Sequence, residues 1–294
     1  MNKVMTTEFK GWTDDNVCIE TGLVYSNRRN QRLKMHLVYP ASFYFEKRWG
    51  FKIEKKYPAI VFVAGSGFTH PVYKGRIGIV CRMAAAGFVV AMVEYSNFLK
   101  GNSFLDTCMD VKTAIRFLRS KAEEYHIDTD RIAAWGTSSG ATDVQYAAFT
   151  GGEESLKTGE YKEFDDSVGA LVSICGPSDM VDLVFTPGHP ETRIYEKYWD
   201  EHPPKKDRKE LCTEASTINL VGNRPIPPVM LAHGTSDDLV PFSHSENMYR
   251  KLTEYGHDVV FYKVKGAGHN TVMTPEIIDA GLAFIKDVFD RQGN

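Results

Sequence analysis

The chain contains 294 residues, of which 43% are hydrophobic and 25% are charged, and its formal net charge at pH 7 is −3. These values are typical of a globular protein that can bury a large core, so its stability requires neither a metal ion nor a disulfide. The sequence has no basic stripe and no polybasic cluster. This absence argues against a nucleic acid or an anionic membrane as a partner.

The cysteines and the apolar segments bear on the cellular compartment. The cysteines are odd in number and no pair has CxxC spacing, so we expect a reduced, intracellular chain whose buried thiols are inert. Residues 1–15 lack an apolar core followed by a small-residue cleavage site. The longest apolar stretch, residues 79–93, is interrupted by Arg82 and Gly87 and is too short to span a bilayer. We therefore expect a cytoplasmic protein with no signal peptide and no membrane span.

The first elements in chain order form an antiparallel pair. Residues 17–25 and 33–39 alternate apolar and polar side chains, and the polar residues 26–30 between them predict a turn. Residues 43–57 are aromatic and charged and end at Pro58. We interpret this segment as a connecting excursion.

From residue 59 onwards, strands alternate with helices. The predicted strands are continuous apolar runs at 59–63, 88–93, 132–135, 170–174, 229–232 and 259–264. The predicted helices are 77–86, 106–124, a segment that starts at 139, 243–255 and 275–289. Such runs indicate strands buried on both faces, and the alternation predicts an α/β fold with a mostly parallel sheet between two layers of helices.

One segment breaks this alternation. Residues 180–228 are charged and rich in proline and aromatic residues, and they are too long for a simple crossover. We predict that they form a cap or lid above the sheet. The chain is then a single domain, residues 1–294, with an insertion at about 180–228.

The pattern Gly136-Thr137-Ser138-Ser139-Gly140 lies between a buried strand and a helix. G-x-S-x-G in this context is typical of a nucleophile elbow, a sharp turn that lifts the serine oxygen above the edge of the sheet. The N-terminal amides of the following helix then point at the reacting atom. We predict that Ser138 is a catalytic nucleophile.

A nucleophilic serine needs a base, and the base needs an acid that orients it. With this type of elbow, the chain order is Ser, then Asp or Glu, then His. His269 follows the last predicted strand in a glycine-containing loop, whereas His257 precedes that strand and lies at its wrong end. We therefore predict His269 as the base.

The acid should follow the preceding strand, and two neighbouring residues meet this condition. Both Asp237 and Asp238 lie in the loop after residues 229–232, so position alone leaves the choice open. Asp179, after an earlier strand, is a weaker alternative. His233 lies at the strand end and is expected to be structural.

Acyl transfer also needs hydrogen-bond donors for the developing oxyanion. The backbone N–H of Ser139, next to the nucleophile, is one expected donor, and the loop after the first parallel strand should supply another. In that loop either Gly67 or Ser66 could donate, and the sequence leaves both open.

Four sequence phrases carry a family resemblance over about residues 33–289: PAIVFVAGSGF, DVKTAIRFLRSKAEEYHIDTDRIAAWGTSSG, PPVMLAHGTSDDLVP and GAGH. The chain resembles the α/β-hydrolase superfamily, in the carboxylesterase and carbohydrate-esterase-like branch related to hormone-sensitive lipase and bacterial acetyl and feruloyl esterases. The family pattern HGxxDxxVP implies Asp237 as the acid. The sequence departs from the family in the oxyanion loop, where Ala64 replaces the usual histidine and Ser66 replaces a glycine.

The resemblance implies a serine esterase that cleaves short-chain acyl esters, such as acetyl groups on a carbohydrate or a similar alcohol, through an acyl-enzyme intermediate. The predicted cap carries aromatic residues that either bind a sugar or phenolic ring or pack the cap: Phe185, His189, Tyr195, Tyr198 and Trp199. The alternatives are a prolyl-oligopeptidase-like peptidase and a non-catalytic binding protein on a hydrolase scaffold. We expect a small-molecule ester as partner and no cofactor or metal, and we leave a homo-oligomer open.

Overall fold

The computed structural model describes residues 16–28, 31–50, 52, 54–71, 73–187 and 192–293. The strands are β1 (Val17–Arg28), β2 (Gln31–Pro40), β3 (Tyr57–Val63), β4 (Val89–Val93), β5 (Ile127–Thr137), β6 (Ala170–Ile174), β7 (Val229–Gly234) and β8 (Val259–Val264). The α-helices are α1 (Ser42–Trp49), α2 (Ile77–Ala85), α3 (Phe104–Ser120), α4 (Ser139–Phe149), α5 (Met180–Phe185), α6 (Thr192–Glu201), α7 (Arg208–Ala215), α8 (Ser243–Glu254) and α9 (Pro275–Gln292).

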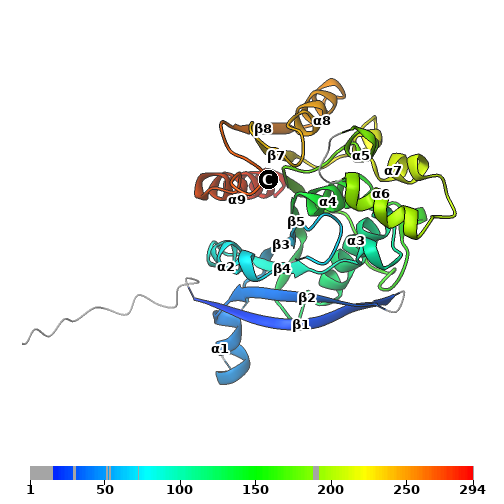
Figure 1. Cartoon of the computed structure of the whole chain (residues 1–294). Helices are drawn as coiled ribbons and strands as arrows, with labels where there is room; N and C mark the ends of the chain where they lie inside the picture. The colour runs from blue at the N-terminus through cyan, green and yellow to red at the C-terminus, as the bar shows by residue number, and fades with distance from the viewer. Residues whose placement is uncertain are drawn as a thin grey trace, which may run out of the picture.

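The strands form one eight-stranded sheet in the order β1-β2-β4-β3-β5-β6-β7-β8. The β1–β2 and β2–β4 pairs are antiparallel, and every pair from β4 to β8 is parallel. Helices α2 and α9 cover one face of the sheet, while α3, α4 and α8 cover the other (Figure 1). The central strands are therefore buried on both faces, which explains why their sequences are continuously apolar.

The sequence predicts most of these elements correctly, with errors at their ends. The predicted strands 170–174 and 259–264 coincide with β6 and β8. In contrast, β1 continues to Arg28 and pairs Arg28 with Gln31, so the polar residues 26–28 belong to the strand and not to a turn. Helix α3 starts two residues earlier than predicted, because Ser103 and Asp106 form a capping box.

The segment predicted as a connecting excursion contains a helix. Residues 42–49 form α1, and Gly50 ends it in the left-handed conformation with φ 72°. The Phe43 ring contacts the rings of Tyr39 and Tyr57, with centroid distances of 5.4 and 4.9 Å. The local sequence does not predict this helix, and the packing of Phe43 against distant residues stabilises it.

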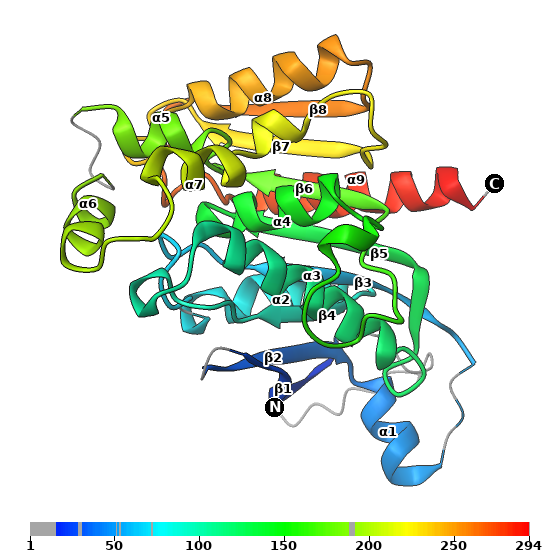
Figure 2. The same ribbon diagram turned by 90° about the vertical axis from the view of Figure 1, so that its right-hand side faces the viewer.

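The inserted segment between β6 and β7 forms the helices α5, α6 and α7. These helices lie together at the end of the sheet where the parallel strands finish (Figure 2). They bury a separate apolar cluster together with Phe68 from the loop after β3, Phe98 from the loop after β4 and Phe104 from the start of α3. Among the helices that the structure describes, none combines the length and the apolar character that a membrane crossing requires.

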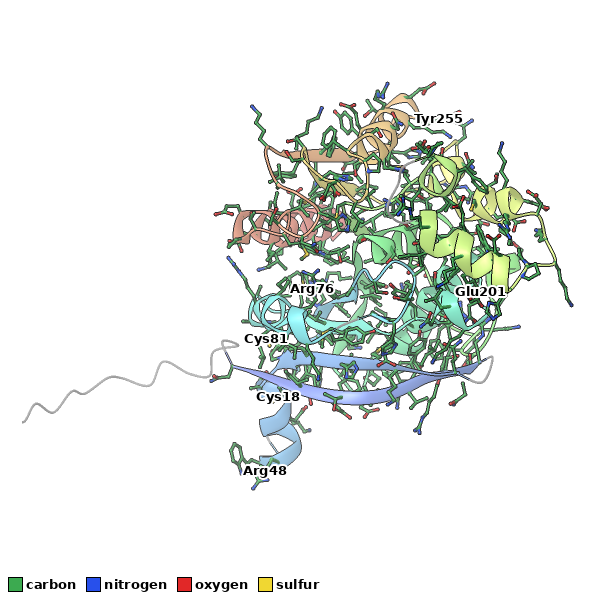
Figure 3. The ribbon with its side chains drawn as sticks, viewed as in Figure 1. Cys18, Arg48, Arg76, Cys81, Glu201 and Tyr255 are labelled. Carbon is green, nitrogen blue, oxygen red and sulfur yellow. The ribbon has the colours of Figure 1, made fainter. Side chains whose placement is uncertain are left out.

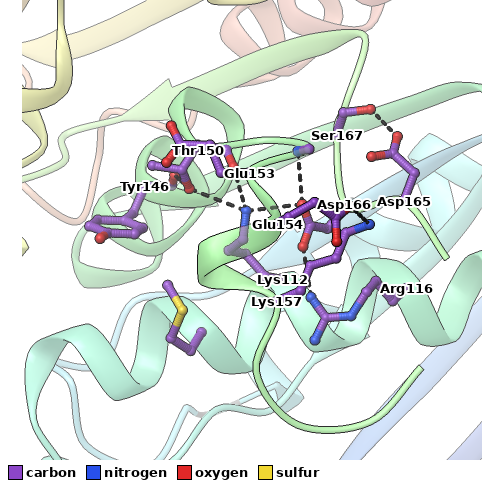
Figure 4. Close-up of polar contacts among 12 residues, drawn as sticks. Lys112, Arg116, Tyr146, Thr150, Glu153, Glu154, Lys157, Asp165, Asp166 and Ser167 are labelled. Carbon is purple, nitrogen blue, oxygen red and sulfur yellow. Dashed lines mark hydrogen bonds and ion pairs between the residues drawn. The ribbon is translucent and has the colours of Figure 1, made fainter. Parts of the chain in front are cut away.

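A buried ion cluster fastens the segment after α4 to α3 (Figure 4). Lys112 and Arg116, one helical turn apart, both contact the carboxylate of Asp166 at 3.0 and 2.7 Å. All three side chains are fully buried. Lys112 also donates to the carbonyl of Thr150 at 2.6 Å, so the charges are hydrogen-bonded as well as paired.

Candidate active site

The turn between β5 and α4 presents Ser138 in a strained conformation. Its backbone has φ 53° and ψ −131°, a combination that non-glycine residues rarely adopt. The chain approaches itself closely on both sides of this turn. A Cβ at Gly136 would lie 2.3 Å from the carbonyl oxygen of Gly140, and a Cβ at Gly140 would lie 2.4 Å from that of Val63. Glycine is therefore required at both positions for the elbow to form.

Three predicted residues from distant parts of the chain meet at this turn. His269, in the loop after β8, has its Nε2 2.9 Å from Ser138 Oγ. Its Nδ1 lies 2.8 Å from Asp237 Oδ2, in the loop after β7. The carboxylate of Asp237 is fully buried and the imidazole is 8% exposed. The result is a continuous hydrogen-bond chain from a hydroxyl through an imidazole to a buried carboxylate.

Asp237 is held by four donors. Its Oδ1 accepts the backbone N–H groups of Leu239 and Val240, both at 2.9 Å, and its Oδ2 accepts from His269 and from His233, the latter at 3.1 Å. Burial raises the pKa of this carboxyl, but the hydrogen bonds from the two histidines and the two amides outweigh it and hold the pKa well below its usual range. Asp237 is therefore ionised throughout the neutral pH range.

His233 is a second partner of the carboxylate that the sequence did not reveal. Its Nε2 faces Asp237 Oδ2 and the Val240 carbonyl, both at 3.1 Å, while its Nδ1 lies 2.7 Å from Ser245 Oγ. Because both partners of Nε2 are acceptors, this nitrogen carries the proton. The spacing of four residues between His233 and Asp237 is the only sequence signal for this contact.

The other candidate acids and bases lie elsewhere. Asp238 is exposed to solvent. Asp179 caps α5 by accepting the N–H groups of Val181 and Asp182. His257 Nε2 bonds the Gly222 carbonyl at 2.9 Å.

The oxyanion loop after β3 packs against the elbow, and the hydroxyl of Ser139 joins the two. The N–H of Ser66 donates to Ser139 Oγ at 2.9 Å. The N–H groups of Gly67 and Ser139 make no hydrogen bond within the part of the chain that the structure describes. Of the two loop residues that the sequence left open, Ser66 therefore has its N–H engaged and Gly67 has its N–H available.

Tyr95 occupies a central position behind this loop, and sequence reasoning missed it. Its fully buried side chain follows β4. Its hydroxyl lies 2.8 Å from Ser66 Oγ, 3.1 Å from Ser139 Oγ and 3.3 Å from the Ala64 carbonyl. Tyr95 thus links the loop to the elbow in a sequence that has Ala64 where the family usually has a histidine.

A cavity of about 280 Å³ opens at Ser138 and His269. Its remaining lining is a mixture of small, polar and apolar residues: Gly65, Ser66, Gly67, Thr69, Arg76, Thr137, Cys175, Ile194, Leu239, Asn270, Val272 and Met273. A second, smaller recess of about 10 Å³ is also lined by Ser138, together with Gly67, Ser139 and side chains that include Phe68 and Tyr195. The serine therefore borders both a large and a small space.

The imidazole of His269 is affected by a thiol that lines the cavity. All five cysteines are free; Cys108, Cys175 and Cys212 are buried, whereas Cys18 and Cys81 are only half-buried, contrary to the expectation of buried thiols throughout. Burial lowers the pKa of His269, but the interactions with Asp237 and Cys175 outweigh it and raise the pKa to about 10. Cys175, which the sequence did not single out, is therefore part of the site.

Cys175, Asp237 and His269 also form the one cluster with metal-ligand spacing among the described residues, with ligand atoms within 4.8 Å of one another. Both ring nitrogens of His269 already take part in hydrogen bonds. A metal ion bound here would have to displace either Ser138 or Asp237 from the imidazole. The donor set is thus better suited to proton transfer than to metal binding.

Most of the predicted aromatic residues of the cap can now be placed. Tyr195 and Trp199 are buried in the separate apolar cluster of α5–α7, while Phe185 is exposed. Tyr198 is partly buried against the same cluster, and His189 lies outside the described residues. For Tyr195 and Trp199, packing within the segment between β6 and β7 is therefore the correct alternative. The Tyr195 hydroxyl also donates to the Gly67 carbonyl at 3.3 Å.

Comparison with known proteins gives a family for this arrangement. The family model BD-FAE matches residues 50–252, which include Ser138 and Asp237. The chain belongs to the BD-FAE family. This BD-FAE member is 28% identical over 224 residues to esterase LipC of Mycobacterium tuberculosis, a match that covers 73% of this chain and 53% of LipC. It is 26% identical over 241 residues to a probable isoprenylcysteine alpha-carbonyl methylesterase of Oryza sativa subsp. japonica, covering 78% of this chain and 55% of that protein. The chain thus spans about half the length of these curated relatives.

Solved structures share the architecture of this BD-FAE member. A truncated carbohydrate esterase from gut microbiota superposes with a TM-score of 0.77 at 23% identity, covering 92% of this chain and 96% of that one. Butyrate-bound esterase 2 of Thermogutta terrifontis gives a TM-score of 0.72 at 20% identity, covering 92% and 94%. The fold is therefore the α/β-hydrolase fold, and the resemblance stated from the sequence is confirmed.

Proposed function

We propose that this protein is a carboxylic ester hydrolase that removes short acyl groups, acetyl above all, through an acyl-enzyme intermediate on Ser138. The observation that carries this proposal is the hydrogen-bond chain from Ser138 through His269 to Asp237 at the mouth of a cavity. The names of its relatives, an esterase and a methylesterase, and of its structural neighbours, a carbohydrate esterase and a butyrate-bound esterase, support an ester as the substrate class.

In the proposed reaction, Ser138 Oγ attacks the ester carbonyl carbon while His269 Nε2 accepts the hydroxyl proton. Asp237 holds the Nδ1–H and stabilises the imidazolium that forms. The bond to the alcohol oxygen then breaks, and His269 gives its proton to that oxygen. A water molecule attacks the acyl-enzyme in the same way, which releases the carboxylic acid and returns the proton to Ser138.

The oxyanion of each tetrahedral intermediate is proposed to accept from the N–H groups of Gly67 and Ser139. We choose Gly67 over Ser66 because the Ser66 N–H already donates to Ser139 Oγ. Ser139, at the start of α4, also benefits from the positive end of the helix dipole. In this scheme the Ser66 hydroxyl and the Ser139 hydroxyl position the loop and do not touch the substrate.

The recess beside Ser138 supports a small acyl group. Its volume of about 10 Å³ is close to what one water molecule requires, so it accepts little more than a methyl group. The larger cavity, of about 280 Å³, remains for the alcohol. The acetyl group is therefore proposed to lie in the recess, with a small-molecule alcohol such as a sugar in the cavity.

Helices α5–α7 are proposed to act as a cap over this site. In helix α6, Ile194 lines the cavity, and the hydroxyl of Tyr195 donates a hydrogen bond to the carbonyl of Gly67. Both contacts come from neighbouring residues on one helical turn. The cap would thus bound the alcohol and hold the oxyanion loop at the same time.

Labelling with a fluorophosphonate, followed by an ester screen, tests the proposal. The wild type and a Ser120→Ala control on α3 should be labelled and should hydrolyse p-nitrophenyl acetate faster than the butyrate, and the butyrate faster than the octanoate. Ser138→Ala should show neither labelling nor turnover. Labelling of Ser138→Ala would refute the nucleophile. A folded protein inactive on every ester would favour a peptidase or a binding protein instead.

A further inference from the structure

The alcohol side of the cavity contains a cation that the proposed reaction does not use. Among the described residues that line this cavity, Arg76 is the one Lys, Arg, Asp or Glu side chain. It is the last residue of a short 3-10 helix, Lys74–Arg76, and directly precedes α2. Figure 3 labels Arg76 near the cyan ribbon of α2, and its contact with Met273 brings it close to the segment that precedes α9.

Arg76 has no carboxylate partner within the part of the chain that the structure describes. Its Nη1 lies 4.0 Å from Met273 Sδ, a weak contact with another residue of the same cavity. Arg82, six residues further along α2, gives the contrast, since its guanidinium binds both oxygens of Asp279 at 2.6 and 2.5 Å. The charge of Arg76 is therefore directed at the substrate space without compensation from the protein.

A guanidinium presents parallel N–H donors that match a carboxylate in two-point contact, and it remains protonated at every working pH. Neutral donors and acceptors accompany it on the cavity wall, namely Thr69 and Asn270. The acyl recess, in contrast, is lined by apolar side chains and the small residues around Ser138. An anionic group would thus be stabilised in the alcohol cavity and not in the acyl recess.

We propose that the natural substrate is a short-acyl ester whose alcohol half carries a carboxylate, and that Arg76 binds this carboxylate. The inference rests on the proposed esterase function and extends it to a substrate class. Arg76 is a specificity-determining residue in this scheme. It pairs with a group remote from the ester bond, so neutral acetyl esters should be hydrolysed without its help.

The test compares two nearly isosteric acetyl esters, 3-acetoxybenzoate and 3-acetoxybenzamide, together with the 4-substituted pair. The ratio of kcat/KM for the anionic ester to that for the neutral ester should fall about tenfold in Arg76→Met, as expected for loss of one charge-assisted contact at a partly exposed site. Arg76→Lys should restore part of the ratio. Arg82→Met, in the following helix α2, should leave the ratio unchanged. The wild-type ratio should also decrease with added salt.

The measurements separate failure of this inference from failure of the esterase proposal. Equal kcat/KM losses on both esters in Arg76→Met, with an unchanged thermal unfolding midpoint, would overturn the role of Arg76 while leaving the esterase function intact. A greater loss on phenyl hydrogen succinate, whose carboxylate is on the acyl half, than on the acetoxybenzoates would overturn the assignment to the alcohol cavity. Absence of hydrolysis of all these esters by wild type would count against the esterase function itself.

Discussion

Replacing Tyr95 by phenylalanine removes one oxygen from behind the oxyanion loop and leaves the ring in place. The lost hydroxyl lies within hydrogen-bonding distance of Ser66 Oγ, Ser139 Oγ and the Ala64 carbonyl. Ser139 Oγ keeps the N–H of Ser66, at 2.9 Å. Ser66 Oγ, on the half-buried wall of the cavity, loses its 2.8 Å partner. An unsatisfied buried polar group costs about 1–3 kcal/mol of unfolding free energy, and we expect the lower end of this range because Ser66 is only half-buried.

The effect on turnover should exceed the effect expected from stability alone. Loss of a whole oxyanion donor lowers kcat by about 10²–10³-fold. Tyr95→Phe leaves the Gly67 N–H present but less firmly placed, so we expect a fall in kcat of roughly 10–100-fold, with KM for p-nitrophenyl acetate changed much less. The assay is steady-state kinetics on this ester together with urea unfolding of the same preparations.

Tyr125→Phe is the matched control. Tyr125 is also a buried tyrosine, and its hydroxyl bonds Glu20 Oε2 at 2.9 Å, away from the oxyanion loop. It should lose a similar amount of stability and keep its kcat. If Tyr95→Phe retained kcat within twofold while losing as much stability as the control, Tyr95 would be an ordinary core residue and the proposed link to the loop would be wrong.

Four further predictions concern ionisable groups of the structure. Asp237→Asn should lower kcat by roughly 10⁴-fold, whereas Asp238→Asn should be nearly silent, and the reverse ranking would reject the acid. Asp166→Ala leaves two buried cations unpaired and should lower the unfolding free energy in urea by about 3–5 kcal/mol; a loss below about 1 kcal/mol would mean that the cluster is not closed to water. Because the base acts in its neutral form and the pKa of His269 is raised to about 10, kcat/KM should rise with pH into the alkaline range. Cys175→Ala removes one of the raising interactions and should move that rise to lower pH, and an unchanged pH profile would exclude an influence of the thiol.

The parts of the site that the sequence predicts are those with a local pattern. Ser138 is identified by the flanking glycines, which are required because the backbone approaches itself closely there. His269 is identified by its place after the last strand. The choice between Asp237 and Asp238 could not come from position, since the residues are adjacent. The choice depends on which carboxylate points into the protein and accepts hydrogen bonds from His233 and two backbone amides. In the sequence, only the family spacing predicts these hydrogen bonds.

The parts that the sequence could not predict depend on contacts between distant segments. Nothing near Tyr95 marks it, because its three partners come from the loop after β3 and from the start of α4. The choice between Ser66 and Gly67 depends on a single hydrogen bond across 73 positions. Similarly, the packing of Phe43 in helix α1 against neighbouring rings is visible only in three dimensions.

The same reasoning connects the cap with the chemistry. Two hydrogen bonds fix the position of the Gly67 peptide. The Tyr95 hydroxyl bonds Ser66, the preceding residue, and the Tyr195 hydroxyl of α6 donates to the Gly67 carbonyl. Tyr195 is itself packed against Phe68, the residue that follows Gly67. A displacement of α6 would therefore move the proposed oxyanion donor as well as Ile194 on the cavity wall. Changes in the cap should consequently affect kcat as well as KM, because one helix bounds the alcohol and holds the group that stabilises the transition state.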